Sequence, residues 1–368
     1  MKIAVLSSHT PSLFWFRMDM MKSFIERGHE VFALGNEDES LWKDKFNESG
    51  ICYRQIKVQR NGTNPFNDIF TLASIVSELK KINPDKMFTY QAKTVIYGGI
   101  AARILGIKDV YPMIAGIGSV FLNNDFKTKI IRSFLVSEYK IGMKKSANVF
   151  FQNNDDKEVF MKYGIIKNQK ITMINGSGVN IDKFHEMPMP EKFTFLCISR
   201  LIKDKGVFEY LEAGRAVKKQ YPSVRFMLVG PFDSNPSALS KEELDEYIKD
   251  GTVEFFGEQK DVLPFLEQAS VFVLPSYREG TPKTNLEAMA CGRAVITTDA
   301  PGCRQTIVAG ENGFLVPVKD VKALSDKMIY LINNEQEAHE MGRKGRKIAE
   351  ELFDVNKVNN VICKTMRL

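Results

Sequence analysis

The sequence predicts an α/β protein made of two Rossmann-like domains, each with a parallel β-sheet, and three observations support this fold class. Short apolar runs alternate with helix-length periodic segments, which is typical of βαβ units. The alternation is interrupted at residues 176–192, where two prolines and two glycines remove all periodicity. At 368 residues, the chain is also longer than a single core usually becomes.

The first domain is predicted over residues 1–180. Its strands are expected in the apolar runs 3–8, 29–35, 86–91, 110–116, 148–153 and 170–175. Open parallel sheets bind ligands beyond the carboxyl ends of their strands, so functional residues are expected in the loops that follow strands.

The second domain is predicted over residues 190–350, after a linker in the interrupted segment. Its strands are expected at 193–199, 224–230, 253–258, 270–276, 294–299 and 313–317. Residues 351–368 are expected to form a C-terminal helix that crosses back to the first domain. The two domains are expected to face each other across a cleft.

Composition and cysteine usage narrow the class of protein. With 44% hydrophobic and 26% charged residues, the chain resembles an ordinary globular protein. A signal-peptide pattern and an uncharged apolar stretch of roughly 18 residues are both missing, so a cytoplasmic protein is expected. The five cysteines form no CxxC or Cys/His cluster, which argues against a disulfide framework or a zinc site.

Basic residues are concentrated in the first half of the chain. Residues 1–185 contain 26 Lys and Arg against 18 Asp and Glu, whereas the remainder contains 25 against 27. In the segment 126–146, cations interleave with apolar residues; these cations are Lys127, Lys129, Arg132, Lys140, Lys144 and Lys145. Such basic amphipathic helices adsorb to anionic bilayers, although a core-packing helix with a lysine-rich outer face has the same spacing.

The segment 270–292 carries the most informative pattern. A strand is predicted to end at Ser276, and a helix to start near Thr281, with Thr281 as its N-cap and Pro282 as its first helical residue. The amides and the positive dipole end of such a helix favour a diphosphate. Gly280 allows a ligand to approach the backbone closely.

Two glutamates bracket this predicted anion site. Glu279 precedes the helix, and Glu287 lies inside it with a side chain that leans toward the helix N-terminus. Because carboxylates accept hydrogen bonds from hydroxyl groups, we hypothesise that Glu287 binds a ribose and Glu279 the transferred sugar. Alternatively, Glu279 is a solvated loop residue and Glu287 occupies the polar face of its helix.

A second cluster follows the first strand of the same domain. Arg200 and Lys205 lie just after that strand and just before Gly206 and a helical segment. Two cations in this position suit a pyrophosphate. The alternative is a solvated basic loop.

These two clusters, with seven residues between the glutamates and the run at 280–292, resemble family 4 glycosyltransferases, which are retaining enzymes of the GT-B fold. The resemblance covers essentially the whole chain. It implies that Arg200 and Lys205 contact the donor diphosphate and stabilise the departing UDP, that Glu279 acts at the donor sugar, and that Glu287 binds the ribose. It also implies phosphate contacts from the backbone of Gly280, Thr281, Pro282, Lys283, Thr284 and Asn285.

Within that family, residues 16–31, 116–121 and 301–317 look similar to bacterial enzymes that build lipid-linked O-antigen, capsule or glycoprotein glycans. The nearest group acts on undecaprenyl-diphosphate-linked sugars, and several members transfer N-acetylgalactosamine (GalNAc). The resemblance implies a hexosyltransferase that uses a UDP-sugar, with UDP-GalNAc the best guess, and a lipid-linked saccharide acceptor. Such an enzyme is expected in the cytoplasm, peripheral on the inner face of the plasma membrane.

The first domain departs from the family pattern. The usual glycine pair after the first strand is replaced by Ser-His-Thr-Pro at residues 8–11, and the histidine after a later strand is replaced by Gln-Ala-Lys at residues 91–93. Acceptor contacts are therefore not carried over. His9 is a candidate catalytic residue because it follows a strand and is expected to face the cleft; the alternative is a polar surface residue.

Neither a metal cofactor nor a nucleic-acid partner is expected. No Walker A or Asp-x-Asp motif occurs, so Arg200, Lys205 and the helix end are expected to neutralise the diphosphate. Two rival interpretations are a sugar-nucleotide epimerase or phosphorylase of the same fold and a non-catalytic scaffold of a polysaccharide assembly complex. The glutamate spacing argues against an epimerase, and the complete set of site residues argues against the scaffold.

Overall fold

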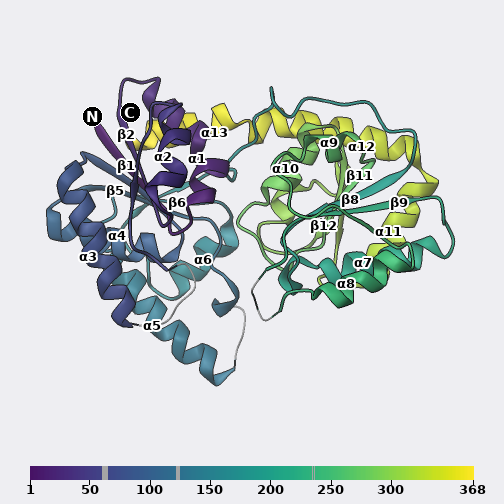
Figure 1. Cartoon of the computed structure of the whole chain (residues 1–368), viewed down its shortest axis with the longest axis horizontal. Helices are drawn as coiled ribbons and strands as arrows, with labels where there is room; N and C mark the ends of the chain where they lie inside the picture. The colour runs from purple at the N-terminus through teal and green to yellow at the C-terminus, as the bar shows by residue number, and fades with distance from the viewer. Residues whose placement is uncertain (60–64, 122–124, 234, 236) are drawn as a thin grey trace. The chain divides into compact units, whose positions relative to one another are not determined.

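The computed structural model describes residues 1–59, 65–121, 125–233, 235 and 237–368. They form two compact units (Figure 1). Unit 1 contains Met1–Ser177 and Val355–Leu368, and unit 2 contains Gly178–Asp354. The predicted division is 1–180, 190–350 and 351–368, whereas the structure places the entry into unit 2 at Gly178 and the return to unit 1 at Val355.

Unit 1 is built on a seven-stranded parallel sheet, which confirms the α/β class predicted for this part of the chain. Its strand order is β3-β2-β1-β4-β5-β6-β7. The strands are β1 (Lys2–Leu6), β2 (Glu30–Gly35), β3 (Cys52–Gln55), β4 (Lys86–Tyr90), β5 (Asp109–Ile114), β6 (Asn148–Phe151) and β7 (Lys170–Met173). Ile3 of the inner strand β1 pairs with Val31 on one side and with Lys86 on the other.

Helices cover both faces of this sheet. They are α1 (Thr10–Ile25), α2 (Glu39–Asn47), α3 (Pro65–Ile82), α4 (Ala92–Leu105), α5 (Phe126–Gly142), α6 (Asn154–Lys162) and α13 (Val355–Met366), with a 3-10 turn η1 (Ser119–Phe121). Ile3 and Val5 of β1 pack with α1, α2 and α13, whereas Ala4 and Leu6 pack with the layer formed by α3 to α6. This alternation is the period-two pattern of a strand buried on both faces.

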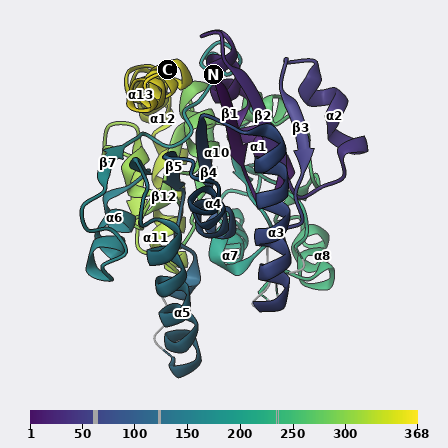
Figure 2. The ribbon, with the colours of Figure 1, turned by 90° about the vertical axis from the view of Figure 1, so that its left-hand side faces the viewer.

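Two glycines fix the crossing of α4 and α5. A Cβ on Gly99 would lie 2.1 Å from the carbonyl oxygen of Gly142, and a Cβ on Gly142 would lie 2.6 Å from the carbonyl oxygen of Ile96. Any larger residue at either position would force the helices apart. The backbone contact holds α5 against α4, which itself lies beside α3 (Figure 2).

Unit 2 contains a six-stranded parallel sheet in the order β10-β9-β8-β11-β12-β13. The strands are β8 (Thr194–Ile198), β9 (Arg225–Val229), β10 (Glu254–Phe255), β11 (Val271–Leu274), β12 (Ala294–Thr298) and β13 (Gly313–Val316). Because β8 pairs directly with β11, the loops that follow these two strands lie next to each other at the carboxyl edge of the sheet.

The helices of unit 2 also form two layers. They are α7 (Val207–Lys218), α8 (Lys241–Lys249), α9 (Leu263–Glu267), α10 (Lys283–Ala290), α11 (Val321–Asn333) and α12 (Glu335–Ile348), with 3-10 turns η2 (Lys203–Lys205) and η3 (Arg304–Thr306) and a π-helical turn η4 (Ala349–Phe353). Helices α7, α8, α11 and α12 pack on one face, and α9, α10 and η4 pack on the other.

The segments by which the chain enters and leaves unit 2 are held together inside that unit. The amide of Val179 donates to the carbonyl oxygen of Phe353 at 2.7 Å. Arg346 Nη1 donates to the carbonyl oxygens of Phe184 at 2.6 Å and Ala290 at 2.8 Å. The predicted linker region lies between β7 and β8 and contains neither helix nor strand.

Several negative features apply to the described part of the chain. All five cysteines are free thiols. Within the described residues, no helix combines the length and the apolar character required to cross a bilayer. The same residues contain no group of three or more His, Cys, Asp or Glu side chains placed to hold a metal ion.

Candidate active site

Helix α10, which follows the loop after β11, begins one residue later than predicted. Pro282 is the N-cap, with φ −69° and ψ 112°, and α10 begins at Lys283. The prediction of Thr281 as N-cap and Pro282 as first helical residue is therefore wrong. The extended ψ of Pro282 lets its carbonyl oxygen accept from the amide of Asn285 at 3.1 Å, which is the role of an N-cap, and the proline ring disfavours a helical Thr281.

This loop is fixed from two neighbouring loops. The carbonyl oxygen of Asp204, after β8, accepts from the amide of Tyr277 at 2.9 Å and from Ser276 Oγ at 3.1 Å. On the other side, the amide of Glu279 donates to the carbonyl oxygen of Pro301 at 2.9 Å. A Cβ on Gly302 would lie 2.2 Å from the carbonyl oxygen of Glu279, so the two backbones are in direct contact. The position of Glu279 is thus set by the backbone on both sides.

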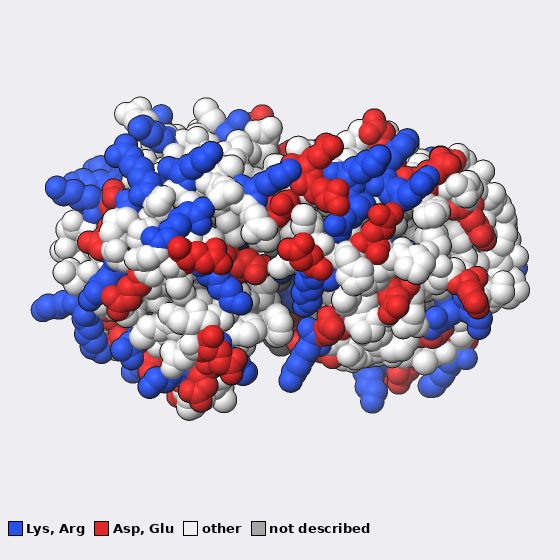
Figure 3. Space-filling model, turned by 90° about the horizontal axis from the view of Figure 1, so that it is seen from above, with Lys and Arg blue, Asp and Glu red and all other residues white. Residues whose placement is uncertain are grey.

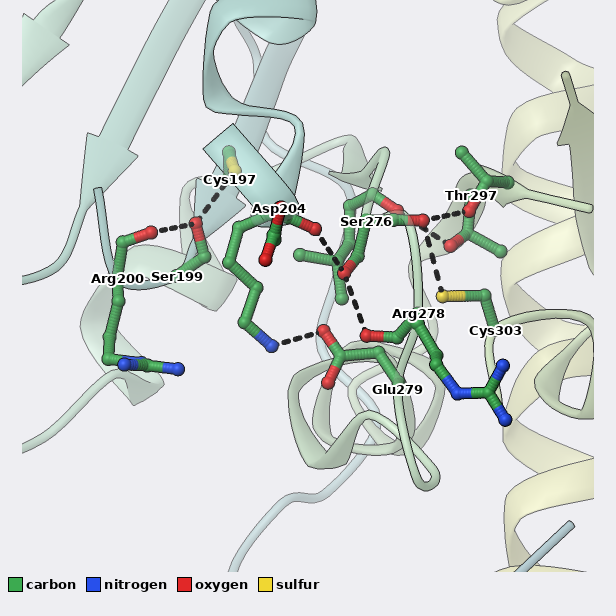
Figure 4. Close-up of polar contacts among 12 residues, drawn as sticks. Cys197, Ser199, Arg200, Asp204, Ser276, Arg278, Glu279, Thr297 and Cys303 are labelled. Carbon is green, nitrogen blue, oxygen red and sulfur yellow. Dashed lines mark hydrogen bonds and ion pairs between the residues drawn. The ribbon is translucent and has the colours of Figure 1, made fainter. Parts of the chain in front are cut away.

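The two clusters predicted from separate segments meet in one ion pair. Lys205 Nζ pairs with Glu279 Oε1, as the dashed line from Glu279 in Figure 4 marks. The Lys205 side chain is 19% exposed and that of Glu279 is 14% exposed. Both side chains are therefore mostly buried. This excludes the alternative in which Glu279 and Lys205 are solvated loop residues.

Gly206 allows this meeting. Its φ is 71°, and a Cβ there would lie 2.1 Å from the carbonyl oxygen of Pro275. Only a glycine fits the left-handed backbone and the close approach to the loop after β11. The 3-10 turn that ends at Lys205 is consequently pressed against the segment that carries Glu279.

Arg200 has its own carboxylate partner. Arg200 Nη1 lies 2.8 Å from Asp233 Oδ2, and the Arg200 side chain is 40% exposed. Asp233 belongs to the loop after β9, the strand next to β8. Asp233 is not among the residues predicted from the sequence, although its place in a loop after a strand beside β8 is the signal that points to it.

Glu287 is buried inside α10, with 8% of its surface exposed. Burial raises the pKa of the Glu287 carboxyl above its ordinary value, and the ammonium groups of Lys283 and Lys183 oppose that rise in part. Lys283 Nζ lies 3.8 Å from Glu287 Oε1. The alternative in which Glu287 occupies a solvated helix face is excluded by this burial.

The remaining residues of the predicted phosphate segment differ in what they offer. Pro282 has no amide hydrogen, and the amide of Asn285 is engaged by the carbonyl oxygen of Pro282. Asn285 is fully buried, and its Nδ2 donates to Thr306 Oγ1 at 2.9 Å, which ties α10 to η3. Neither residue therefore offers the amide that the prediction assigns to it. Gly280, Thr281, Lys283 and Thr284 lie at the start of α10, between Glu279 and Glu287.

In unit 1, the two departures from the family pattern come together. Gln91 Oε1 accepts from Ser7 Oγ at 2.9 Å, from the amide of Ser8 at 2.9 Å and from Ser8 Oγ at 2.8 Å. Gln91 has φ 72° and ψ 145°, a strained backbone for a residue other than glycine. His9 is the N-cap of α1, but its side chain does not cap the helix. Gln91 thus anchors the loop that carries His9.

Of the cations predicted to face a bilayer, one is buried and the others are exposed. Arg132 is 8% exposed, so its assignment to a membrane-facing set is wrong. Its Nε donates to the carbonyl oxygen of Val120 at 2.9 Å and its Nη1 to Tyr163 Oη at 2.9 Å. The other cations of the set are exposed; they are Lys127, Lys129, Lys140, Lys144 and Lys145.

The fold and the site define a glycosyltransferase of the GT-B fold. The sequence matches the family Glycosyl transferases group 1 over residues 180–348 and the family Glycosyl transferase 4-like over residues 2–153. The chain belongs to this family of hexosyltransferases, the family 4 glycosyltransferases.

Individual relatives agree with this assignment. The chain is 30% identical over 350 residues to the N,N'-diacetylbacillosaminyl-diphospho-undecaprenol alpha-1,3-N-acetylgalactosaminyltransferase of Campylobacter jejuni, covering 91% of this chain and 90% of that protein. It is 26% identical to the UDP-Gal:alpha-D-GlcNAc-diphosphoundecaprenol alpha-1,3-galactosyltransferase of Escherichia coli over 71% and 70% of the two chains. The crystal structure of Anabaena HepE with UDP and glucose superposes with a TM-score of 0.80 at 18% identity, covering 100% and 99% of the chains.

Proposed function

We propose that this protein is a retaining glycosyltransferase that moves a sugar, GalNAc as best candidate, from a UDP-sugar to an undecaprenyl-diphosphate-linked saccharide. The product would enter a surface polysaccharide or a glycoprotein glycan. The observation that carries this proposal is the ion pair between Lys205 and Glu279 at the carboxyl edge of the unit 2 sheet. Two relatives whose names specify diphospho-undecaprenol acceptors support the acceptor class.

The ion pair suits a site that exchanges partners when the donor binds. In the structure, Glu279 neutralises the Lys205 ammonium, and both side chains are mostly buried. In the proposed complex, the diphosphate takes over Lys205, and the released carboxylate accepts hydrogen bonds from sugar hydroxyls. As the bond to the anomeric carbon breaks, negative charge grows on UDP, and Lys205 and Arg200 stabilise it.

Glu287 is proposed to bind the ribose. Its carboxyl is mostly buried inside α10, where two ribose hydroxyls would donate to its oxygens. The start of α10, at Lys283, adds the positive end of the helix dipole near the phosphates. With these charges in place, we propose that transfer needs no metal ion.

In unit 1, we propose that His9 acts at the acceptor hydroxyl. Its loop follows β1 at the carboxyl edge of the sheet, where ligands bind in folds of this kind. Gln91 holds that loop through three hydrogen bonds to Ser7 and Ser8.

We also propose that α5 rests on the inner face of the plasma membrane. Its outer surface carries exposed apolar side chains: Phe126 is 80% exposed, Phe134 is 70% exposed, and Ile130 and Ile141 are about half exposed. A core-packing helix with a purely lysine-rich outer face would not present these residues. Phenylalanine and isoleucine flanked by lysines match the two requirements of interfacial binding, apolar insertion and attraction to anionic lipid.

The net charge of unit 1 supports contact between this unit and an anionic membrane. Unit 1 contains 28 Lys and Arg against 17 Asp and Glu, a net charge of +11, whereas unit 2 contains 23 against 28, a net charge of −5. On the face shown in Figure 3, blue side chains are numerous along the left-hand margin of unit 1, the left-hand lobe, with red side chains among them. An anionic surface would attract unit 1 and repel unit 2.

The proposal is tested by UDP release from a panel of UDP-sugars, with the purified full chain and short-chain prenyl-diphosphate-linked monosaccharides, with and without EDTA. We expect release that depends on the acceptor, persists in EDTA and is fastest with UDP-GalNAc, and an anomeric configuration preserved in the product. UDP-sugar binding without release for every acceptor would indicate the scaffold. Conversion of the sugar nucleotide without an acceptor would indicate the epimerase.

A further inference from the structure

Arg17 of α1 is a buried cation for which the described residues supply no counter-ion. It is 3% exposed, and its Nε is fully buried without a hydrogen-bond partner. Within the described ranges, no hydrogen bond or ion pair joins its terminal nitrogens to the protein, and these nitrogens, unlike Nε, are not fully buried. The contact that remains is with the ring of Tyr90, whose centroid lies 4.9 Å from Arg17 Cζ.

A protein rarely buries an arginine in this way. Removing a guanidinium from water is costly unless its donors are satisfied, and a cation–π contact offsets only part of that cost. Burial lowers the pKa of Arg17 to about 10, so the group is still protonated at neutral pH. The tyrosine ring offers no acceptor for the five N–H donors of the guanidinium. The described residues therefore supply no acceptor for these donors, which leaves them available to water or to a bound anion.

The surroundings of Arg17 place it at the ligand-binding edge of unit 1. Tyr90 is the last residue of β4, and its Oη lies 2.6 Å from Ser12 Oγ in the first turn of α1. Helical side chains lean toward the helix N-terminus, so Arg17 reaches toward that same turn. Gln91 Nε2 also donates to Ser12 Oγ, at 3.2 Å. Four polar groups thus lie close together at the carboxyl edge of the sheet: the Arg17 guanidinium, the hydroxyls of Ser12 and Tyr90, and the side-chain amide of Gln91.

We propose that Arg17 is the centre of an anion site in unit 1 that binds a phosphate group, with the one hydroxyl hydrogen that the Ser12–Tyr90 hydrogen bond leaves free as an additional donor. A guanidinium presents paired donors that match two oxygens of one phosphate. Resting on the proposed function, the phosphate is one of the two in the lipid-linked acceptor. The donor diphosphate would then be held by Lys205 in unit 2 and the acceptor diphosphate by Arg17 in unit 1.

Arg132 provides a matched control. It is also a buried arginine of unit 1, but its guanidinium donates to the carbonyl oxygen of Val120 and to Tyr163 Oη. Replacing Arg132 with methionine removes satisfied hydrogen bonds, so the Tm should fall. Replacing Arg17 with methionine removes an unsatisfied charge, so in buffer without phosphate the Tm should stay the same or rise.

The anion site is tested with inorganic pyrophosphate as the probe. Because pyrophosphate also suits the donor site, the comparison is made in the Lys205→Met background. We expect pyrophosphate to raise the Tm of Lys205→Met but not of Lys205→Met/Arg17→Met, with Arg17→Lys giving a partial response. An equal rise with and without Arg17, or a Tm of Arg17→Met that falls as far as that of Arg132→Met, would overturn the proposal and leave Arg17 as a packing residue.

The source of the phosphate is tested by kinetics in the otherwise native chain. For the acceptor diphosphate, Arg17→Met should raise the KM for a prenyl-diphosphate-linked monosaccharide about tenfold and leave the KM for the UDP-sugar unchanged. A lost pyrophosphate response with an unchanged acceptor KM would support a site for free phosphate or another phosphorylated ligand. If the native chain turned over no acceptor, the proposed function would fail, but the pyrophosphate comparison would still decide on the site.

Discussion

Lys205 and Glu279 form an ion pair although 74 positions separate them in the chain. The pair joins the loop after β8 to the loop after β11, two strands that are neighbours in the sheet. In the structure, the Lys205 ammonium and the Glu279 carboxylate contact each other directly. Substitutions at either position should therefore affect both catalysis and the charge balance of the loop.

Lys205→Met is expected to lower kcat by about 100- to 1000-fold, because the variant lacks the fixed positive charge beside the phosphate on which negative charge develops. Steady-state UDP release measures this. Lys203→Met is the matched control, since Lys203 lies in the same 3-10 turn but is exposed. Similar losses in both variants would show that the net charge of the turn, not Lys205 itself, is what matters.

Glu279→Ala is expected to lower kcat about 10- to 100-fold, the usual effect of losing hydrogen bonds to a charged group. The variant should remain folded, because the backbone of Glu279 is held by the carbonyl oxygen of Pro301 and by contact with Gly302. Circular dichroism melting controls for misfolding. Unchanged kinetics in a folded Glu279→Ala would remove Glu279 from the site.

Glu287 should make stability depend on pH. Its pKa is raised by burial, and the charged groups that act on it are Lys283 and Lys183, which lower the pKa, and Asp261, which raises it. A carboxyl with a raised pKa folds more favourably when protonated, so its contribution is present at low pH and is lost as the pH rises through the raised value. The window therefore lies above the ordinary value of 4.5.

Glu287→Gln removes this ionisation. Compared with the native chain in urea unfolding, the variant should gain relative stability as the pH rises through that window and then level off. A stability difference that is flat over the whole range would contradict the assignment. The same variant should raise the KM for the UDP-sugar, because an amide is a weaker acceptor for the ribose hydroxyls than a carboxylate.

Gln91 allows backbone strain and side-chain anchoring to be separated. Gln91→Gly loses the three hydrogen bonds to Ser7 and Ser8 but tolerates φ 72°, whereas Gln91→Ala loses the same bonds and keeps the strain. Gln91→Ala should thus be less stable than Gln91→Gly by about 1 kcal/mol in urea unfolding. Both should lower kcat through the loop of His9. Greater stability of the alanine variant would mean that the strain is absent.

Membrane binding should depend on the exposed aromatic residues of α5. Phe126→Ser/Phe134→Ser should reduce sedimentation with vesicles that contain anionic lipid, because both side chains are more than two-thirds exposed. Ile248→Ser in α8 of unit 2 is the control, since that residue is 40% exposed in a unit with negative net charge. Equal sedimentation of all three proteins would place membrane contact elsewhere.

Much of the fold follows from the sequence because buried parallel strands are continuous apolar runs, as in β1 and β11. Strand β3 escapes this pattern: it lies at the sheet edge, and within it only Tyr53 is buried. The start of α10 differs from the prediction because proline fixes φ but leaves ψ open, and at Pro282 the extended ψ makes it a cap.

The site is recognisable in its residue types but not in its pairing. Arg200, Lys205, Glu279 and Glu287 are identified from two local patterns. Which cation meets which carboxylate depends on the strand order, which places β9 and β11 on either side of β8. For that reason Asp233 could not be assigned as the partner of Arg200 from spacing alone. Arg17 is hidden for a similar reason, because its burial depends on where α1 packs.

The membership of α13 in unit 1 affects how the protein is made. Val358, Ile362, Cys363 and Met366 are buried against the same sheet face as α1, yet the ribosome synthesises them after the whole of unit 2. During translation, the part of this sheet face that α13 covers therefore stays exposed while unit 2 is free to fold to completion. The packing of unit 1 is completed only when α13 has been synthesised. The newly made chain is therefore most prone to aggregation between the synthesis of unit 1 and that of α13.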